Sequence, residues 1–136
     1  MARDATGASG TKRDLVISWA TILYGAALTI VFVGVTQWLL ARRAIATVVY
    51  AALASAGGAI AWNAILHATG GQQFFVDAPI VVFPVSWQDT GSGVFALAAT
   101  SVALGLGPER HAPAATTSRL ALLAGAAALV VDIYLY

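Results

Sequence analysis

The sequence predicts an all-α membrane protein: a four-transmembrane-helix up-down bundle with one long apolar, proline-containing loop between the second and third helices. Two observations support this fold class. Hydrophobic residues make up 60% of the 136 residues and charged residues only 10%, whereas about 25% of a soluble domain is charged. The apolar residues also gather into four long runs, and a helix that crosses a bilayer needs roughly 20 such residues.

The first apolar run covers residues 15–41 and follows a small, polar tail without apolar periodicity at residues 1–13. The run has no charge and is too long for the apolar core of a signal peptide, so we expect a full membrane span. Arg42 and Arg43 end it, and the second run, residues 44–66, begins at once. A connector this short predicts a tight antiparallel helical hairpin.

The third run, residues 90–107, ends at a Gly-Pro pair, where proline cannot continue the helical hydrogen-bond ladder. The fourth run covers residues 118–136 and carries one acid near its end. We therefore expect residues 14–136 to form a single transmembrane four-helix domain behind a flexible tail at residues 1–13.

Residues 67–89, HATGGQQFFVDAPIVVFPVSWQD, separate the second run from the third. This stretch is too apolar for an ordinary exposed loop, and Pro79 and Pro84 exclude a continuous helix. Three conformations are open for this stretch: it lies along the membrane interface, it folds back over the end of the bundle as a lid, or it forms two short extended segments that pair with each other. Each alternative places its apolar side chains against lipid, another protein or the bundle itself. At its end we expect Asp89 or Thr90 to cap the third helix.

The basic residues assign the two faces of the membrane. Four spans place the termini and the 67–89 loop on one face, and the connectors at 42–43 and 107–117 on the other. The connector face holds four Lys or Arg residues and the loop face three, and cytoplasmic loops carry the excess. We therefore predict that both termini are extracytoplasmic. Because the margin is one residue, the opposite orientation, with Lys12 and Arg13 in the cytoplasm, stays open.

The connector face also supplies candidate ligands for lipid. Arginine side chains at a cytoplasmic membrane surface attract anionic headgroups, although such charges commonly do no more than fix orientation. The candidate headgroup contacts are Arg42, Arg43, Arg110 and Arg119.

Small residues recur at helical spacing in every run, the pattern by which membrane helices approach one another closely. The stripes are Ser18, Thr21, Gly25, Thr29 and Thr36, interrupted by Phe32, in the first run; Ala52, Ala56, Ala59 and Asn63 in the second; Ala96, Thr100, Ala103 and Gly107 in the third; and Ala121, Gly125, Ala128 and Asp132 in the fourth.

A candidate polar cluster lies on the loop face. Asn63 and His67 are one helical turn apart and therefore share a helix face, and Asp77 and Asp89 belong to the same membrane side. One histidine with scattered aspartates is a weak pattern for a metal site, and a solvated helix end explains it as well. We assign no catalytic residue, metal ligand or cofactor, and the absence of cysteine excludes thiol chemistry.

Asp132 is a separate candidate because it is an acid inside an apolar run. An ionisable side chain within a span is costly unless it is paired or hydrated, and such residues are often functional. Lys12 and Arg13 are its candidate partners, since four spans bring them to the same membrane face. A boundary ion pair or a hydrated carboxylate that only stabilises the bundle is the simpler interpretation.

These patterns predict a small integral membrane protein that acts as an accessory or assembly subunit, or as a homo-oligomer, with loop 67–89 as its extracytoplasmic contact surface. The alternative is a small-molecule or lipid carrier or channel with a cavity between the helices. A third hypothesis, a membrane enzyme using His67, Asp77 and Asp89, lacks a defined nucleophile, base and orienting group. The expected partners are the lipid bilayer and either another membrane protein or a second copy of this chain. We expect no nucleic-acid partner.

Overall fold

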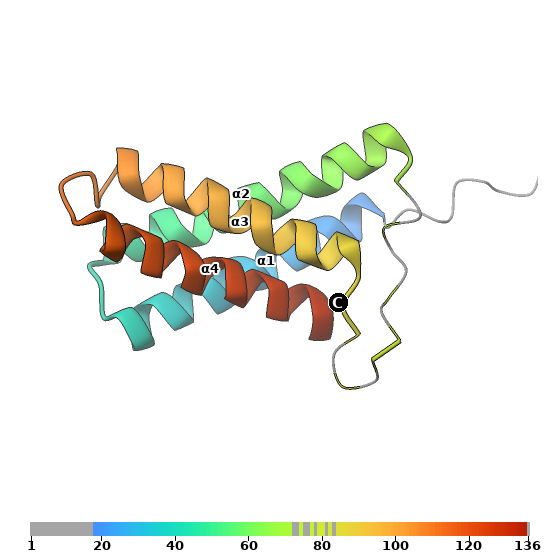
Figure 1. Ribbon diagram of the computed structural model, residues 1–136, viewed down its shortest axis with the longest axis horizontal. Helices are drawn as coiled ribbons and strands as arrows, with labels where there is room; N and C mark the ends of the chain where they lie inside the picture. Colours follow the sequence, from blue (N-terminus) through green and yellow to red (C-terminus); the bar gives the residue numbers. More distant parts are fainter. Residues whose placement is uncertain are drawn as a thin grey trace, which may run out of the picture.

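A computed structural model describes residues 18–71, 74, 77, 79–80, 82 and 84–135. Its regular elements in these residues are all helices, which lie side by side along one axis (Figure 1). They are α1 (Trp19–Thr36), a π-helix η1 (Gln37–Ala41) that continues α1, α2 (Ile45–Thr69), α3 (Trp87–Leu106) and α4 (Ala114–Tyr134). All four long helices, with η1 counted in the first, are long and apolar enough to cross a membrane. The chain therefore has the helices of a multi-pass integral membrane protein.

The four predicted apolar runs correspond to the four helices, but several ends differ. The second helix continues to Thr69, three residues beyond its apolar run, and stops at Gly70, whose φ of 65° is the left-handed conformation that favours glycine. The fourth helix begins at Ala114, four residues before its apolar run, and its first turn consists of two exposed alanines and two half-buried threonines. The tail at residues 1–13, with Lys12 and Arg13, lies outside the described residues.

The third helix begins at Trp87 because Ser86 caps it. The Ser86 hydroxyl accepts from the Asp89 N–H at 3.1 Å, and Asp89 Oδ2 accepts from the Ser86 N–H at 2.7 Å. This reciprocal pair is a capping box, which satisfies two backbone donors that a helix start leaves open. The expectation that Asp89 or Thr90 would be the cap itself was wrong, because Asp89 is the second partner of the box. The connector between α2 and α3 is therefore residues 70–86, shorter than the predicted loop.

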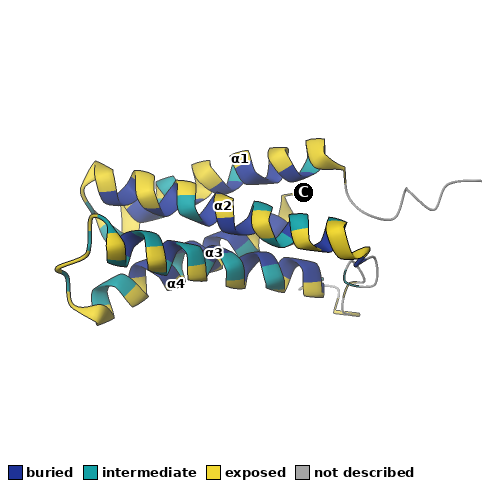
Figure 2. Cartoon of the chain, turned by 90° about the horizontal axis from the view of Figure 1, so that it is seen from above, coloured by how far each residue is buried: buried dark blue, intermediate teal, exposed yellow. Residues whose placement is uncertain are grey.

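The helices form a four-membered ring in which α1 and α3 each pack against both α2 and α4. The α2 and α4 helices also meet across the bundle. Seen from above, the buried faces of the helices turn toward one another and the exposed faces turn outward (Figure 2). Exposed leucine, valine and isoleucine side chains cover much of the outer surface, as expected for a surface in contact with lipid tails.

The small-residue stripes form the helix contacts. Every member of the stripes on α2 and α4 is buried. At Gly58 the backbones of α2 and α3 touch, so that an added Cβ would lie 2.8 Å from the Ala96 nitrogen. At Gly125 an added Cβ would lie 2.8 Å from the Leu97 Cβ on α3. Close backbone packing of this kind replaces hydrophobic burial as the main attraction between helices in a bilayer.

Side-chain contacts show which helix ends lie together. At one end, the Trp19 ring at the start of α1 stacks on His67 near the end of α2, with centroids 4.9 Å apart. The Tyr134 hydroxyl at the end of α4 donates to the Val82 carbonyl at 2.8 Å. The connectors at 42–44 and 107–113 meet at the other end, where Arg43 contacts Glu109. The two connectors are thus on one face of the molecule and the 70–86 segment on the other.

Candidate functional site

Buried polar side chains gather where α2 ends, α3 begins and α4 ends. We call Asn63, Gln88, Ser92 and Asp132 the polar cluster; each is at most 5% exposed. Asn63 continues the alanine stripe of α2, and Asp132 ends the stripe of α4. Gln88 and Ser92 are one turn apart on α3 and therefore share a face. Close packing by small residues thus brings four polar groups from three helices into one buried place.

Amide side chains link α2 to α3 within the polar cluster. Gln88 Nε2 donates to Asn63 Oδ1 at 3.2 Å and lies 3.4 Å from Ser92 Oγ. Asn63 Nδ2 donates to the Ala59 carbonyl at 3.0 Å and also lies 3.4 Å from Ser92 Oγ. The Trp62 indole N–H donates to the Gln88 carbonyl at 2.9 Å. Buried polar groups that are this well connected stabilise one helix register over others.

Asp132 joins the polar cluster from α4, where its carboxyl group interacts with the Ser92 hydroxyl. Its second oxygen, Oδ2, is buried and makes no hydrogen bond within the described residues. No Lys or Arg side chain in that same part of the chain forms an ion pair with it, and the candidate partners Lys12 and Arg13 lie outside it. A buried carboxyl group with a free oxygen can hold a proton or a small cation.

The structure gives the four residues of the predicted His and carboxylate cluster different surroundings. Asn63 belongs to the polar cluster, and Asp89 is buried in the capping box of α3. His67 stacks on Trp19, and Asp77 is exposed on the connector. Among the described residues, no group of three or more His, Asp or Glu side chains is arranged to hold a metal ion.

Sequence reasoning missed Gln88 and Ser92. Both lie in the run WQDTGSG, which we interpreted only as a helix start. Their spacing of four residues was the available signal, because it places both side chains on one face once the helix begins at Trp87. The missed feature was the cap at Ser86, without which Gln88 belongs to the loop.

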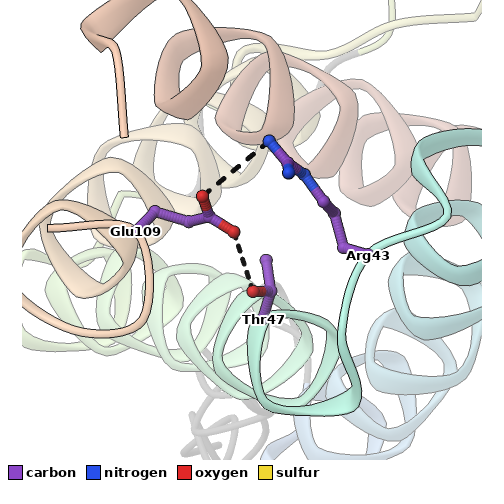
Figure 3. Close-up of polar contacts among 3 residues, drawn as sticks. All are labelled: Arg43, Thr47 and Glu109. Carbon is purple, nitrogen blue, oxygen red and sulfur yellow. Dashed lines mark hydrogen bonds and ion pairs between the residues drawn. The ribbon is translucent and has the colours of Figure 1, made fainter. Parts of the chain in front are cut away.

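A second polar site lies at the opposite end of the bundle (Figure 3). Glu109 sits between two partners: Oε1 accepts from the Thr47 hydroxyl at 2.8 Å, and Oε2 lies 3.8 Å from an Arg43 nitrogen. The Glu109 side chain is only 10% exposed. This bridge joins the 42–44 connector, the start of α2 and the turn after α3, so it fixes the two connectors relative to each other.

The four predicted headgroup arginines are all near this second end but differ in their contacts. Arg43 is paired with Glu109, whereas Arg110 donates through Nε to His111 Nε2 at 3.0 Å. Arg42 has a φ of 48°, an uncommon left-handed conformation for a residue other than glycine, and it forms the tight turn between α1 and α2. Arg119 is exposed on the second turn of α4.

Comparison with protein-family models, with curated proteins and with solved structures finds no match to this chain. Any function must therefore be inferred from the geometry of the molecule. Its most informative features are the polar cluster, the arginine end and the exposed apolar side chains of the 70–86 segment.

Proposed function

We propose that this chain is a small integral membrane protein that acts as an accessory or assembly subunit. Its contact surface is the apolar side of the segment between α2 and α3. One observation carries the proposal: Ile80 and Val82 on this segment are 53% and 83% exposed, and Trp87 at the start of α3 is 70% exposed. Concentrated exposed apolar side chains usually mark a binding surface.

This apolar surface is attached to the bundle. The Tyr134 hydroxyl holds the Val82 carbonyl at 2.8 Å, which ties the segment to the end of α4. Trp87 also lines a hollow of about 260 Å³, whose walls are aromatic and other small or apolar groups: Trp62, Phe74, Trp87, Thr90, Gly91, Val94 and Phe95. An aromatic-lined hollow that shares Trp87 with the exposed apolar surface can receive an anchoring side chain, the usual centre of a protein interface.

The proposed orientation puts this surface on the extracytoplasmic side of the membrane. The helices cross the bilayer up and down, the arginine end faces the cytoplasm, and the 70–86 segment and both termini face the other side. The positive-inside rule supports this orientation, since Arg42, Arg43, Arg110 and Arg119 all lie at one end of the bundle. The partner is then a membrane protein with an apolar extracytoplasmic or interfacial surface.

A photo-crosslinking amino acid at Val82, introduced in the native membrane, tests this proposal. The matched control is the same amino acid at Leu53, which is exposed on α2 and faces lipid in the proposed arrangement. We expect a protein adduct of discrete mass from Val82 and none from Leu53, and Ile80→Asp should abolish the Val82 adduct. A dimer of this chain would support the homo-oligomer form. Lipid adducts alone from Val82 would overturn the proposal.

A second candidate function is transport of a proton or a small cation, and the free Oδ2 of Asp132 favours it. Deeper in the bundle, Ser55 and Thr100 also have buried hydroxyl groups without hydrogen bonds in the described part of the chain. The close backbone contacts at Gly58 and Gly125 leave no room for a larger solute. Flux of protons or Na⁺ into liposomes should then stop in Asp132→Asn and persist in Ser55→Ala; equal flux in both variants would exclude this role for Asp132.

A further inference from the structure

A hollow of about 480 Å³ lies between η1 and α4 at the arginine end of the bundle. Leu40 and Ala41 line it from η1, Arg43 from the connector, and Thr116, Arg119, Leu120 and Leu123 from α4. Its size is within the range of small-molecule sites, about 300 to 1,000 Å³. The polar cluster and the apolar 70–86 segment are at the other end, so neither contributes to this hollow.

The hollow is polar at the membrane face and apolar toward the bilayer centre. On α4, Thr116 and Arg119 are nearer the start of the helix, and Leu123 is one turn deeper. The η1 side has the same order, because Leu40 is deeper than Arg43. Two guanidinium groups and a hydroxyl group thus lie above leucine side chains. This order matches a phosphate group with an attached hydrocarbon chain, and it does not match a free inorganic anion.

A buried glutamine holds the two walls in place. Gln37, the first residue of η1, is fully buried and donates through Nε2 to the Leu120 carbonyl at 2.7 Å. This bond joins η1 to α4 at Leu120, which also forms part of the lining of the hollow. π-Helical turns are rare and occur frequently at functional sites, because the wider turn changes the direction of the following side chains. Here the turn places Leu40 and Ala41 opposite α4.

The charges of the hollow are incompletely neutralised. Arg43 has Glu109 at 3.8 Å, a distance at the long end for an ion pair, and Glu109 also accepts from Thr47. Arg119 forms no ion pair with any described residue. Guanidinium groups bind phosphate oxygens well because their N–H groups form a fork of matching geometry.

We propose that this hollow binds an anionic phospholipid, with Arg43 and Arg119 contacting its phosphate group and Leu40, Leu120 and Leu123 contacting its acyl chain. The site takes one lipid from the cytoplasmic leaflet and does not depend on the proposed partner surface at the other end. Basic pockets between membrane helices on the cytoplasmic side commonly recognise anionic headgroups.

Native mass spectrometry of the full chain in neutral detergent tests this site, with phosphatidylglycerol, phosphatidylcholine or inorganic phosphate added as probes. We expect one phosphatidylglycerol retained per chain in preference to phosphatidylcholine. Arg43→Gln and Arg119→Gln should each weaken retention about fivefold, the effect of losing one cation near a lipid phosphate. Inorganic phosphate at the same concentration should not displace the lipid.

Two variants separate a specific site from general attraction. Arg110→Gln removes an equal charge from the same end but outside the hollow, so it should leave lipid retention unchanged. Glu109→Gln breaks the ion pair with Arg43 while keeping both guanidinium groups, so it should retain lipid at least as well as the natural chain. Equal losses in Arg110→Gln and Arg119→Gln, or equal retention of both lipids, would overturn the proposal. Displacement by inorganic phosphate would overturn its assignment to a lipid.

Discussion

At the scale of single residues, two serines show how much depends on hydrogen-bond partners. Ser55 on α2 and Ser92 on α3 are both fully buried. Ser92 contacts Asn63, Gln88 and Asp132, whereas the Ser55 hydroxyl has no partner in the described part of the chain. The same side chain therefore supports the bundle at one position and adds little at the other.

Replacing these serines by alanine tests that difference. Ser92→Ala should lower the free energy of unfolding by about 0.5 to 2 kcal/mol, because the buried amide groups of Asn63 and Gln88 each lose one polar contact and the Asp132 carboxyl group loses its Ser92 partner. Ser55→Ala loses no hydrogen bond and gains helix propensity, so its stability should be equal or slightly higher. The free energy of unfolding of both variants can be measured by titration with a denaturing detergent. Equal destabilisation would show that the polar cluster does not stabilise the bundle.

Some of the buried polar residues could be predicted from the sequence, and others could not. Asn63 and Asp132 were visible because each is a polar residue at the end of a stripe of small residues at helical spacing. Gln88 and Ser92 were hidden because their importance depends on where α3 begins, and a cap four residues before the apolar run sets that point. Gln37 was missed because its role depends on Leu120 of α4, a contact that no local pattern encodes.

At the scale of elements, α2 contains adjacent glycines with opposite surroundings. An added Cβ on Gly58 would meet the backbone of Phe95 and Ala96 on α3, whereas one on Gly57 would have nothing within 4 Å. Backbone cannot move aside as a flexible side chain can, so only Gly58 is required for the α2–α3 contact.

This pair gives a matched prediction for helix packing. Gly58→Ala should destabilise the bundle by about 1 to 3 kcal/mol, since α2 and α3 must separate to admit the methyl group. Gly57→Ala should be neutral or stabilising by up to about 1 kcal/mol, because alanine is the better helix former. Thermal unfolding in detergent compares them. A stable Gly58→Ala variant would contradict the close backbone contact.

Element positions were easier to predict than element ends. Four apolar runs gave four helices because length and hydropathy act over about 20 residues. The observed ends of α2, α3 and α4 differ from the predicted ends by three or four residues, because a glycine ends α2, a serine caps α3 and α4 begins with a turn of alanine and threonine. Apolar content alone carries no information about those local interactions.

At the scale of the whole molecule, the two ends of the bundle differ in chemistry. One end carries the arginines, the Glu109 bridge and the amphipathic hollow beside η1. The other carries the polar cluster and the exposed apolar side chains of the 70–86 segment. Both proposals depend on this separation, because a lipid site in the cytoplasmic leaflet and an extracytoplasmic partner surface need opposite faces of the membrane.

The most direct test of the four-span arrangement is the labelling of single cysteines in sealed, right-side-out vesicles. The chain has no cysteine, so each introduced thiol is unique. Suitable exposed positions are Asp77 on the 70–86 segment, Ala115 at the start of α4 and Ala98 in the middle of α3.

A membrane-impermeant maleimide should label Asp77→Cys at once and Ala115→Cys only after the vesicles are permeabilised. Ala98→Cys should react in neither case until the protein is denatured, because it faces the lipid tails. Labelling of Asp77→Cys and Ala115→Cys from the same side, or ready labelling of Ala98→Cys, would contradict the four-span bundle with opposite chemistry at its two ends.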